Sequence, residues 1–337
     1  MMVKPRAIAL FSGGLDSALA VRMLQQQGFE VEGLHVRTLF ACCQAPASHL
    51  AEELGIALHV VPVGDDYLEL VRRPRYGYGK GMNPCVDCRI YMARLARRLM
   101  EQRKASLVIS GEVLGQRNMS QKRVDLEIIA RESGLLGRLL RPLSARRLPP
   151  TAVEQSGLVD RSRLGDLAGR SRKPQLALAR QFGLRNVPAP SSGCALADVR
   201  FAQRVRDLLA HHPRPGRADY QLLRIGRHVR LDAHTKVVLG RNETQNRALQ
   251  TLVFSPELGM SALAVPADFA GPTALILGPL HEEVVRRVGA LVLQFARRNQ
   301  PGTLRLITAE DRSGRVCSAE PWPAGMATGS HSSAEIL

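Results

Sequence analysis

Apolar positions in the first part of the chain follow two alternating spacings. Short apolar runs predict four strands, and amphipathic runs between them predict three helices. The expected strands are Ala7–Phe11, Val31–Val36, Leu58–Val63 and Leu107–Ser110, and the expected helices are Ser17–Gln27, Ser48–Leu54 and Arg89–Arg103. This alternation predicts an α/β domain whose parallel twisted sheet has helices on both faces and binds ligands beyond the carboxyl ends of its strands.

The pattern changes after Asp198 and predicts a smaller α+β domain. The expected elements are a helix over Val199–His211, β-type segments near Leu222–Leu231, Lys236–Leu239 and Ala274–Leu277, and a helix over His281–Arg298. We therefore expect domains at residues 1–198 and 199–309. Residues 310–337 are rich in Gly, Ser, Pro and Ala, a composition that predicts a disordered tail.

The composition of the chain predicts its cellular compartment and the kind of partner it binds. No apolar run of the 337 residues approaches the length of a membrane span, and the apolar stretch near the start is too short for a secretory signal, so we expect a cytoplasmic protein. The formal net charge is +17, and residues 131–185, which we call the arginine band, carry a net charge of +8. Such an uneven distribution favours a polyanionic partner, RNA or DNA.

The first expected strand runs directly into Ser12, Gly13 and Gly14, and Asp16 and Ser17 follow at the start of a helix. Glycines let backbone amides approach an anion, and the helix start adds the positive end of its dipole. The stretch therefore predicts a phosphate cradle. A carboxylate beside phosphate indicates Mg²⁺ between them, so we expect a metal-bound nucleotide. The alternative is a plain glycine turn with an N-capping serine.

Three of the six cysteines stand where reactive or metal-binding thiols are expected. Cys85 and Cys88 form a CxxC pair before the helix expected from Arg89, and Cys194 lies in a glycine-flanked turn. Helix starts and nearby arginines lower the pKa of a thiol. Three thiolates suit a [4Fe–4S] cluster with one open iron, whereas structural zinc usually takes four ligands.

The other cysteines and two basic residues near the CxxC pair leave alternatives open. Cys42 and Cys43 follow the second strand, and with the CxxC pair they form an alternative zinc site. Cys317 lies in the expected tail and is given no role. Lys80 and Arg89 flank the CxxC pair, either as ligands of phosphate or of the acceptor carbonyl, or as solvated charges.

The segment Ser12-Gly-Gly-Leu-Asp-Ser17 resembles the SGGxDS loop of the PP-loop (N-type) ATP pyrophosphatase family. Members of this family have an adenine nucleotide alpha hydrolase-like, Rossmann-like fold. They cut ATP between the α and β phosphates and transfer AMP to a carbonyl oxygen. The resemblance implies that Ser12, Gly13, Gly14 and Ser17 hold the phosphates of ATP and that Asp16 binds them through Mg²⁺.

Two further segments resemble the tRNA thiouridylase, or ThiI-like, branch of that family. The first is Asn83-Pro-Cys-Val-Asp-Cys88 together with the later Cys194, and in this branch such cysteines bind a cluster or relay a persulfide. The resemblance implies that Cys85, Cys88 and Cys194 handle sulfur and, with Asp16, carry out catalysis.

The second segment is the run 111–121, which has Asn118 where the branch has proline. This resemblance implies that Gly111, Gln116 and Ser120 complete the nucleotide pocket. The alternative for Gln116 is a helix cap.

A motif in the second domain adds to the expectation of RNA. The stretch Gly240-Arg-Asn-Glu-Thr-Gln-Asn246 resembles the RNA-binding domain of NFACT proteins. Together with the arginine band it implies a folded RNA recognised by shape. The expected partners are tRNA, a sulfur donor (sulfide or a persulfide carrier protein) and a second copy of the chain in a homodimer.

Taken together, these features predict that the chain catalyses ATP-dependent thiolation of a tRNA uridine. A carbonyl oxygen of the uridine is adenylated, and sulfur from a cluster or a persulfide then displaces AMP. The expected cofactors are ATP, Mg²⁺ and a [4Fe–4S] cluster, with zinc as the alternative. Two other classes stay open: a PP-loop enzyme with a small-molecule acceptor, and a non-catalytic, metal-stabilised RNA-binding protein.

Overall fold

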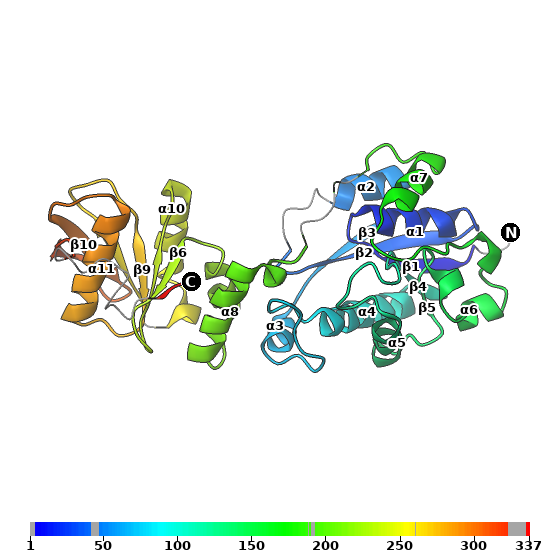
Figure 1. Cartoon of the computed structure of the whole chain (residues 1–337), viewed down its shortest axis with the longest axis horizontal. Helices are drawn as coiled ribbons and strands as arrows, with labels where there is room; N and C mark the ends of the chain where they lie inside the picture. Colours follow the sequence, from blue (N-terminus) through cyan, green and yellow to red (C-terminus); the bar gives the residue numbers. More distant parts are fainter. Residues whose placement is uncertain (1–3, 42–46, 188, 190–192, 260, 323–334) are drawn as a thin grey trace. The chain divides into compact units, whose positions relative to one another are not determined.

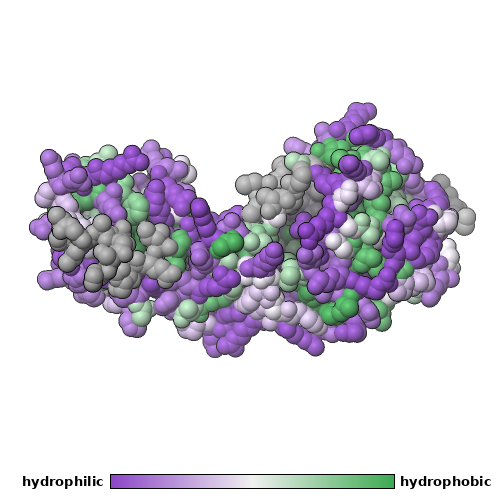
Figure 2. Space-filling view, in the orientation of Figure 1, coloured by the Kyte–Doolittle hydropathy of each residue, from purple (hydrophilic) through white to green (hydrophobic). Residues whose placement is uncertain are grey.

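The computed structural model describes residues 4–41, 47–187, 189, 193–259, 261–322 and 335–337. The chain divides into two compact units, Met1–Ala197 and Asp198–Leu337, each described by itself below (Figure 1). This division falls within one residue of the boundary expected from the sequence. Hydrophilic residues cover most of the face of each unit in Figure 2. Among the described residues, no helix is long and apolar enough to cross a membrane.

The first unit is built on a parallel sheet with the strand order β3-β2-β1-β4-β5. Its strands are β1 Arg6–Leu10, β2 Glu30–Arg37, β3 Leu58–Pro62, β4 Leu107–Ser110 and β5 Leu139–Leu140. The order reverses between β1 and β4, which are neighbours in the sheet but far apart in the chain. In open parallel sheets this switch point is where ligands bind.

Helices cover both faces of this sheet, as the sequence predicts (Figure 1). They are α1 Leu15–Gln25, α2 Ala47–Leu54, α3 Asp65–Arg72, α4 Cys85–Gln102, α5 Arg123–Glu132, α6 Ala152–Gln155 and α7 Lys173–Gln181. One apolar core lies under α1, α2 and α7, and the other lies under α4 and α5. The expected α/β architecture is therefore confirmed.

One predicted boundary is wrong in a way that matters for the site. The helix expected from Arg89 begins at Cys85, with Pro84 as its N-cap residue. Proline fits a helix start because the first amides of a helix have no partner within it. Cys85 and Cys88 therefore lie in the first turn of α4, where the sequence placed them just before the helix.

The second unit contains an antiparallel sheet with the order β11-β10-β8-β9-β7-β6-β12. Its strands are β6 Arg227–Arg230, β7 Lys236–Leu239, β8 Ser261–Pro266, β9 Ala274–Leu277, β10 Gly302–Thr308, β11 Arg315–Ala319 and β12 Glu335–Ile336. Its helices are α8 Val199–His211, α9 Arg217–Leu222, α10 Glu243–Leu252 and α11 Glu282–Phe295. The predicted α+β class is confirmed.

The disordered tail expected from residue 310 is a misprediction for the part that the structure describes. Strand β11 pairs with β10, and β12 pairs with β6. On β11 the side chains of Cys317 and Ala319 face the apolar core, while the alternate residues Val316 and Ser318 are exposed. Alternating burial of this kind is typical of a strand with one buried face. The sequence does not show it clearly, because β11 consists mostly of small and polar residues.

Candidate functional site

The loop after β1 has the geometry of an anion cradle. Gly13 has φ +75°, and a Cβ atom at this position would lie 2.9 Å from Ala47, so the turn requires glycine. Helix α1 starts directly after it, with Gly14 as the N-cap residue. The Ser17 hydroxyl donates a hydrogen bond to the Gly14 carbonyl at 2.7 Å and lies 3.4 Å from the Ser12 hydroxyl. Two hydroxyls and the amide end of α1 thus meet at one edge of the sheet.

The loop after β4 touches this cradle through the main chain. A Cβ on Gly111 would lie 2.5 Å from the carbonyl carbon of Asp16 and 2.5 Å from the amide nitrogen of Ser17. Gln116 donates a hydrogen bond from Nε2 to Asp16 Oδ2 at 3.0 Å. The two loops at the switch point of the sheet therefore form one surface.

The electrostatics of Asp16 follow from this enclosure. Burial raises the pKa of Asp16, whereas the hydrogen bond from Gln116 and the charges of Arg172 and Arg117 lower it, and the net change is upward. A half-buried carboxylate beside a phosphate cradle offers the oxygen ligand that Mg²⁺ takes. The residues present therefore fit a Mg²⁺–nucleotide. Ser120, in the loop after β4, is buried.

The arginine band reaches this surface. The Gly169 amide donates a hydrogen bond to the Leu114 carbonyl at 2.7 Å, and Ala168 pairs with Leu114 in an isolated β-bridge. This part of the band therefore contacts the loop after β4. Arg170 donates a hydrogen bond to the side-chain oxygen of Asn118 at 2.7 Å. Asn118 is the residue that stands where the thiouridylase branch has a proline. The basic residues of the band thus begin at the cradle itself.

The two cysteines of the CxxC pair each accept a hydrogen bond. Asn83 Nδ2 donates to Cys85 Sγ at 3.0 Å, and the Tyr67 hydroxyl donates to Cys88 Sγ at 3.2 Å. Burial raises the pKa of Cys88, and the hydrogen bond from Tyr67 and the charge of Arg89 oppose that rise. Sequence reasoning missed Tyr67, because it lies on α3, an element that was not predicted.

The segment that carries Cys194 docks against the CxxC loop. The Met82 amide donates to the Leu196 carbonyl at 2.7 Å, and the Ala195 amide donates to the Phe40 carbonyl at 2.9 Å. A Cβ on Gly81 would lie 2.2 Å from the Leu196 carbonyl oxygen. These main-chain contacts bring Cys194 beside the loop that leads into α4. Cys42 and Cys43 lie outside the described residues.

Tyr67 and Arg117 both lie within electrostatic range of several predicted site residues. Burial raises the pKa of Tyr67, and the charges of Cys88, Cys194 and Cys85 raise it further. Burial and the charge of Arg89 lower the pKa of Arg117, while Cys85, Asp16 and Cys194 oppose that change. Arg117, which was not among the predicted site residues, therefore interacts electrostatically with both the nucleotide loop and the thiols.

A second residue missed from the sequence is Glu112. This carboxylate is buried, accepts hydrogen bonds from Ser110 at 3.0 Å and Arg141 at 3.1 Å, and forms an ion pair with Arg89 at 3.7 Å. Arg89 is thus partnered by a buried acid instead of being a solvated charge. Lys80 is exposed.

A metal cluster needs several ligands close together in space. Within the described ranges of the chain, no three His, Cys, Asp or Glu side chains lie close enough together to hold a metal ion. The described thiols therefore do not form a ready three-ligand site, and the iron–sulfur cluster stays a prediction.

In the second unit the GRNxxxN motif fixes the start of α10. Asn242 accepts a hydrogen bond from the Gln245 amide at 3.0 Å as the N-cap residue. Asn246 accepts from the Thr273 amide at 3.1 Å, and a Cβ on Gly240 would lie 2.0 Å from the Asn246 side-chain oxygen. The glycine and both asparagines of the motif therefore have structural roles.

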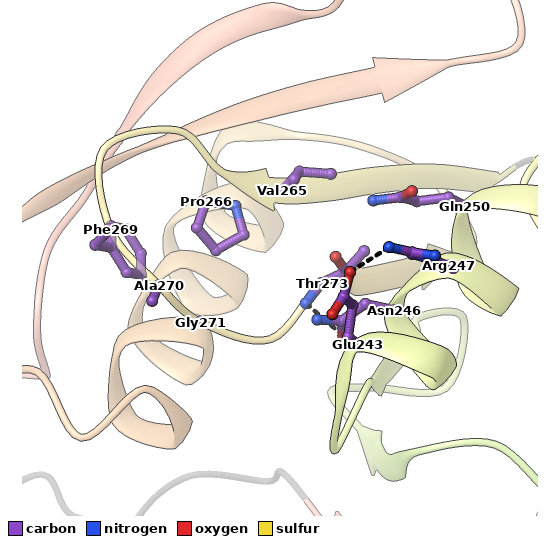
Figure 3. A pocket seen from close by; sticks show the side chains of 10 residues that line it. All are labelled: Glu243, Asn246, Arg247, Gln250, Val265, Pro266, Phe269, Ala270, Gly271 and Thr273. Carbon is purple, nitrogen blue, oxygen red and sulfur yellow. Dashed lines mark hydrogen bonds and ion pairs between the residues drawn. The ribbon is translucent and has the colours of Figure 1, made fainter.

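A pocket of about 450 Å³ lies beside this motif, between α10 and the segment that joins β8 to β9 (Figure 3). Arg247 and Glu243 form an ion pair at one end, and Phe269 and Pro266 lie at the other. The remaining residues that line it are Asn246, Gln250, Val265, Ala270, Gly271 and Thr273. The pocket thus combines a guanidinium, amides and one aromatic ring.

Comparisons with known proteins follow the same division of the chain. Residues 5–132 match the family model of the tRNA methyl transferase HUP domain, and residues 226–325 match the NFACT protein RNA binding domain. These matches confirm the resemblance to the PP-loop tRNA thiouridylase branch and to NFACT proteins.

Two curated relatives illustrate the extent of the similarity. The tRNA-specific 2-thiouridylase MnmA of Natranaerobius thermophilus is 31% identical over 108 residues, which are 26% of this chain and 29% of the relative. The enzyme of the same name from Synechococcus sp. (strain CC9605) is 29% identical over 167 residues, 42% of this chain and 44% of the relative. The chain thus spans less than half the length of these relatives.

A solved 4-thiouridine synthetase–RNA complex with bound ATP aligns with 53% of this chain and 52% of its own, at 19% identity and a TM-score of 0.33. A likeness this distant carries no argument about function.

Proposed function

We propose that this chain, in which a HUP domain is joined to an NFACT-type RNA-binding domain, is an ATP-dependent sulfurtransferase that thiolates a uridine of tRNA. The observation that carries the proposal is the place of Arg117. Arg117 follows Gln116, whose side chain donates a hydrogen bond to Asp16 at 3.0 Å, and its charge interacts with Asp16, Cys85 and Cys194. A phosphate cradle and sulfur-bearing residues that share one arginine suit an enzyme that activates an acceptor with ATP and then sulfurates it.

The activation step uses the loops at the switch point. Ser12, Gly13, Gly14 and Ser17 hold the phosphates of ATP, and Asp16 binds Mg²⁺, which neutralises the phosphate charge when bound. The uridine carbonyl oxygen attacks the α phosphate, and pyrophosphate leaves. The amide end of α1 stabilises the negative charge on the departing phosphates.

The sulfur step uses the thiols beside Arg117. We place the sulfur on a cysteine of the set Cys85, Cys88 and Cys194, because Cys85 and Cys88 each accept a side-chain hydrogen bond that can hold a sulfur anion. The terminal sulfur of a persulfide attacks the activated carbon, and AMP leaves. A second thiol of the set then cleaves the sulfur–sulfur bond, so the two cysteines are oxidised to a disulfide and the transferred sulfur is left on the uridine.

The test is tRNA thiolation by the full chain with ATP, Mg²⁺ and a persulfide donor. Thiouridine is measured by mass spectrometry of nucleosides, and pyrophosphate release is measured alongside it. We expect Cys194→Ser to abolish thiolation and to leave ATP affinity within about twofold, because Cys194 lies on the thiol side of the site. The matched control is Cys317→Ser, since Cys317 lies on β11 in the second unit and contacts Leu304.

Three outcomes contradict the proposal. If thiolation persists in Cys194→Ser, this cysteine is not required for the sulfur step. Pyrophosphate release that depends on a small-molecule acceptor and ignores tRNA identifies the alternative enzyme class. A chain that binds tRNA and never turns over ATP is the non-catalytic binder.

Metal content decides between the two sulfur carriers. Purification without oxygen is followed by assays for iron, acid-labile sulfide and zinc. About four irons per chain that disappear in Cys85→Ser, Cys88→Ser and Cys194→Ser identify the [4Fe–4S] cluster. Protein that thiolates tRNA without iron supports the cysteine-bound sulfur placed here.

A change at Gly81 tests how the thiol site is assembled. In Gly81→Ala the new Cβ meets the Leu196 carbonyl oxygen at 2.2 Å, so the CxxC loop and the Cys194 segment must separate. We expect thiolation to fall about tenfold, the effect of a displacement near 1 Å on a reacting geometry being of this order or larger. ATP affinity is the internal control and stays unchanged. Full activity in this variant contradicts the assembly described above.

A further inference from the structure

Tyr67 is a buried residue whose hydroxyl lies in the thiol site. It comes from α3, and only 1% of its surface is exposed. Its ring packs edge-on against Tyr91 with centroids 5.3 Å apart, and the Phe40 ring lies 6.4 Å away. These contacts fix the direction of the hydroxyl, which donates to Cys88 Sγ at 3.2 Å.

The hydroxyl of Tyr67 has a different kind of hydrogen-bond acceptor from the hydroxyls of two other tyrosines of this region. Tyr78 donates to the main-chain oxygens of Val71 and Arg72, each at 2.8 Å, and Tyr91 donates to Asp66 at 3.0 Å. Oxygen acceptors such as these are the usual partners of a tyrosine hydroxyl. Tyr67 instead donates to sulfur, which is a weak acceptor as a neutral thiol and a stronger one as an anion.

A buried hydroxyl is costly where packing alone is required. Phenylalanine would fill the same space between Phe40 and Tyr91 without removing a hydroxyl group from water. The hydroxyl therefore contributes most when Cys88 carries a negative sulfur. A persulfide or thiolate at Cys88 is such an acceptor.

We propose that Tyr67 is a positioning residue whose hydroxyl holds the sulfur of Cys88 for the loading and transfer of sulfane sulfur. The inference rests on the proposed function for the transfer step, but not for the loading step. In loading, the Cys88 sulfur attacks the terminal sulfur of a donor persulfide. The sulfur–sulfur bond of the donor breaks, a new one forms at Cys88, and the donor leaves as a thiol, so no external oxidant or reductant takes part.

The test compares Tyr67→Phe with Tyr91→Phe in the full chain. Both changes remove one hydroxyl and keep the ring, and the two rings are in contact, so a general loosening of the packing affects both variants. Each protein is incubated with glutathione persulfide, labelled with an alkylating reagent and digested. Tandem mass spectrometry then measures sulfane sulfur on Cys88 itself, separately from Cys85, which lies on the same peptide.

We expect Tyr67→Phe to slow loading at Cys88 about fivefold, the loss that corresponds to one hydrogen bond. Loading in Tyr91→Phe stays within about twofold of the unaltered chain. In the thiolation assay, kcat of Tyr67→Phe falls by a similar factor while KM for ATP is unchanged. Restoring tyrosine restores both rates.

The possible results separate this inference from the proposed function. Equal loading in Tyr67→Phe and the unaltered chain, with both folded, overturns the role of Tyr67. An equal decrease in both variants also overturns it, because the effect then comes from packing. A chain that loads sulfur in a Tyr67-dependent way and never thiolates tRNA supports the role in loading and overturns the proposed function.

Discussion

Replacing Gly111 with alanine lowers the affinity of the chain for ATP by about tenfold to a hundredfold. The added Cβ meets main-chain atoms of Asp16 and Ser17 at 2.5 Å, a separation that neither can relieve by a side-chain rotation. Forcing an extra carbon into packed structure costs about 1 to 3 kcal/mol. The displacement falls on the first turn of α1, where we place the phosphates. The affinity is measured by titration calorimetry with a non-hydrolysable ATP analogue.

The matched control for this variant is Gly64→Ala. Gly64 also precedes a helix, but its added Cβ meets a side-chain atom, Asp66 Oδ1 at 2.8 Å, instead of main-chain atoms. We expect its ATP affinity to equal that of the unaltered chain. Equal affinity in Gly111→Ala contradicts the placement of ATP at the switch point of the sheet.

Replacing Asp207 with asparagine lowers the free energy of unfolding of the second unit by about 3 to 5 kcal/mol. The Asp207 side chain is 6% exposed and accepts hydrogen bonds from Arg230 at 2.8 Å and from Lys236 at 2.7 Å. Lys236 is itself 6% exposed, so the neutral variant leaves a buried ammonium without its counter-ion. Removing one partner of a buried pair costs more than the pair contributes, because the remaining charge stays out of water.

Urea unfolding measures this change. The single tryptophan of the chain, Trp322, packs against the core of the second unit, so its fluorescence reports on that unit. The control is Glu283→Gln, which removes an ion pair with Arg286 whose partners are both more than half exposed. Exposed pairs contribute about 0 to 1 kcal/mol. A change below about 1 kcal/mol in Asp207→Asn contradicts the prediction.

The same carboxylate gives the second unit an acid-sensitive contribution. Burial raises the pKa of Asp207. The hydrogen bond from Arg230 and the charge of Lys236 outweigh that effect and lower the pKa to about 2. Because the folded pKa lies below the unfolded value of 3.8, its stabilisation is complete above about pH 4 and is lost as the pH falls towards 2. We expect a loss of about 2 kcal/mol over this range, and a smaller loss in Asp207→Asn.

The sequence predicted the scaffold of the first unit well, because each element there has a strong local pattern. The run Leu107–Ser110 is completely apolar up to its serine and became β4 with the expected bounds. The glycine loop was recognisable because its residue types are required by the backbone itself, as the positive φ of Gly13 shows. The predicted start of α4 lies four residues late, because the amphipathic pattern begins only after the CxxC pair, whereas the helix itself begins directly after Pro84.

The rest of the site depends on contacts that no local pattern encodes. Tyr67 and Glu112 are far in sequence from the cysteines and arginines that they contact. One signal was present for Tyr67: Asp65 and Asp66 open a segment whose apolar residues recur at helical spacing, which is typical of a short amphipathic helix. Glu112 lies two residues after β4, and its burial depends on the ion pair with Arg141, a contact that no local pattern of the sequence predicts.

The two glycines that join the segments of the site have a consequence for how its sequence can change over time. At Gly81 and Gly111 one stretch of main chain lies directly against another, and the main chain is the same whatever side chains surround it. The fit at these two junctions therefore does not depend on which side chains stand around them. At the junctions themselves any of the other nineteen residues adds the carbon that pushes the segments apart, so a lineage that loses either glycine must rebuild the site around it.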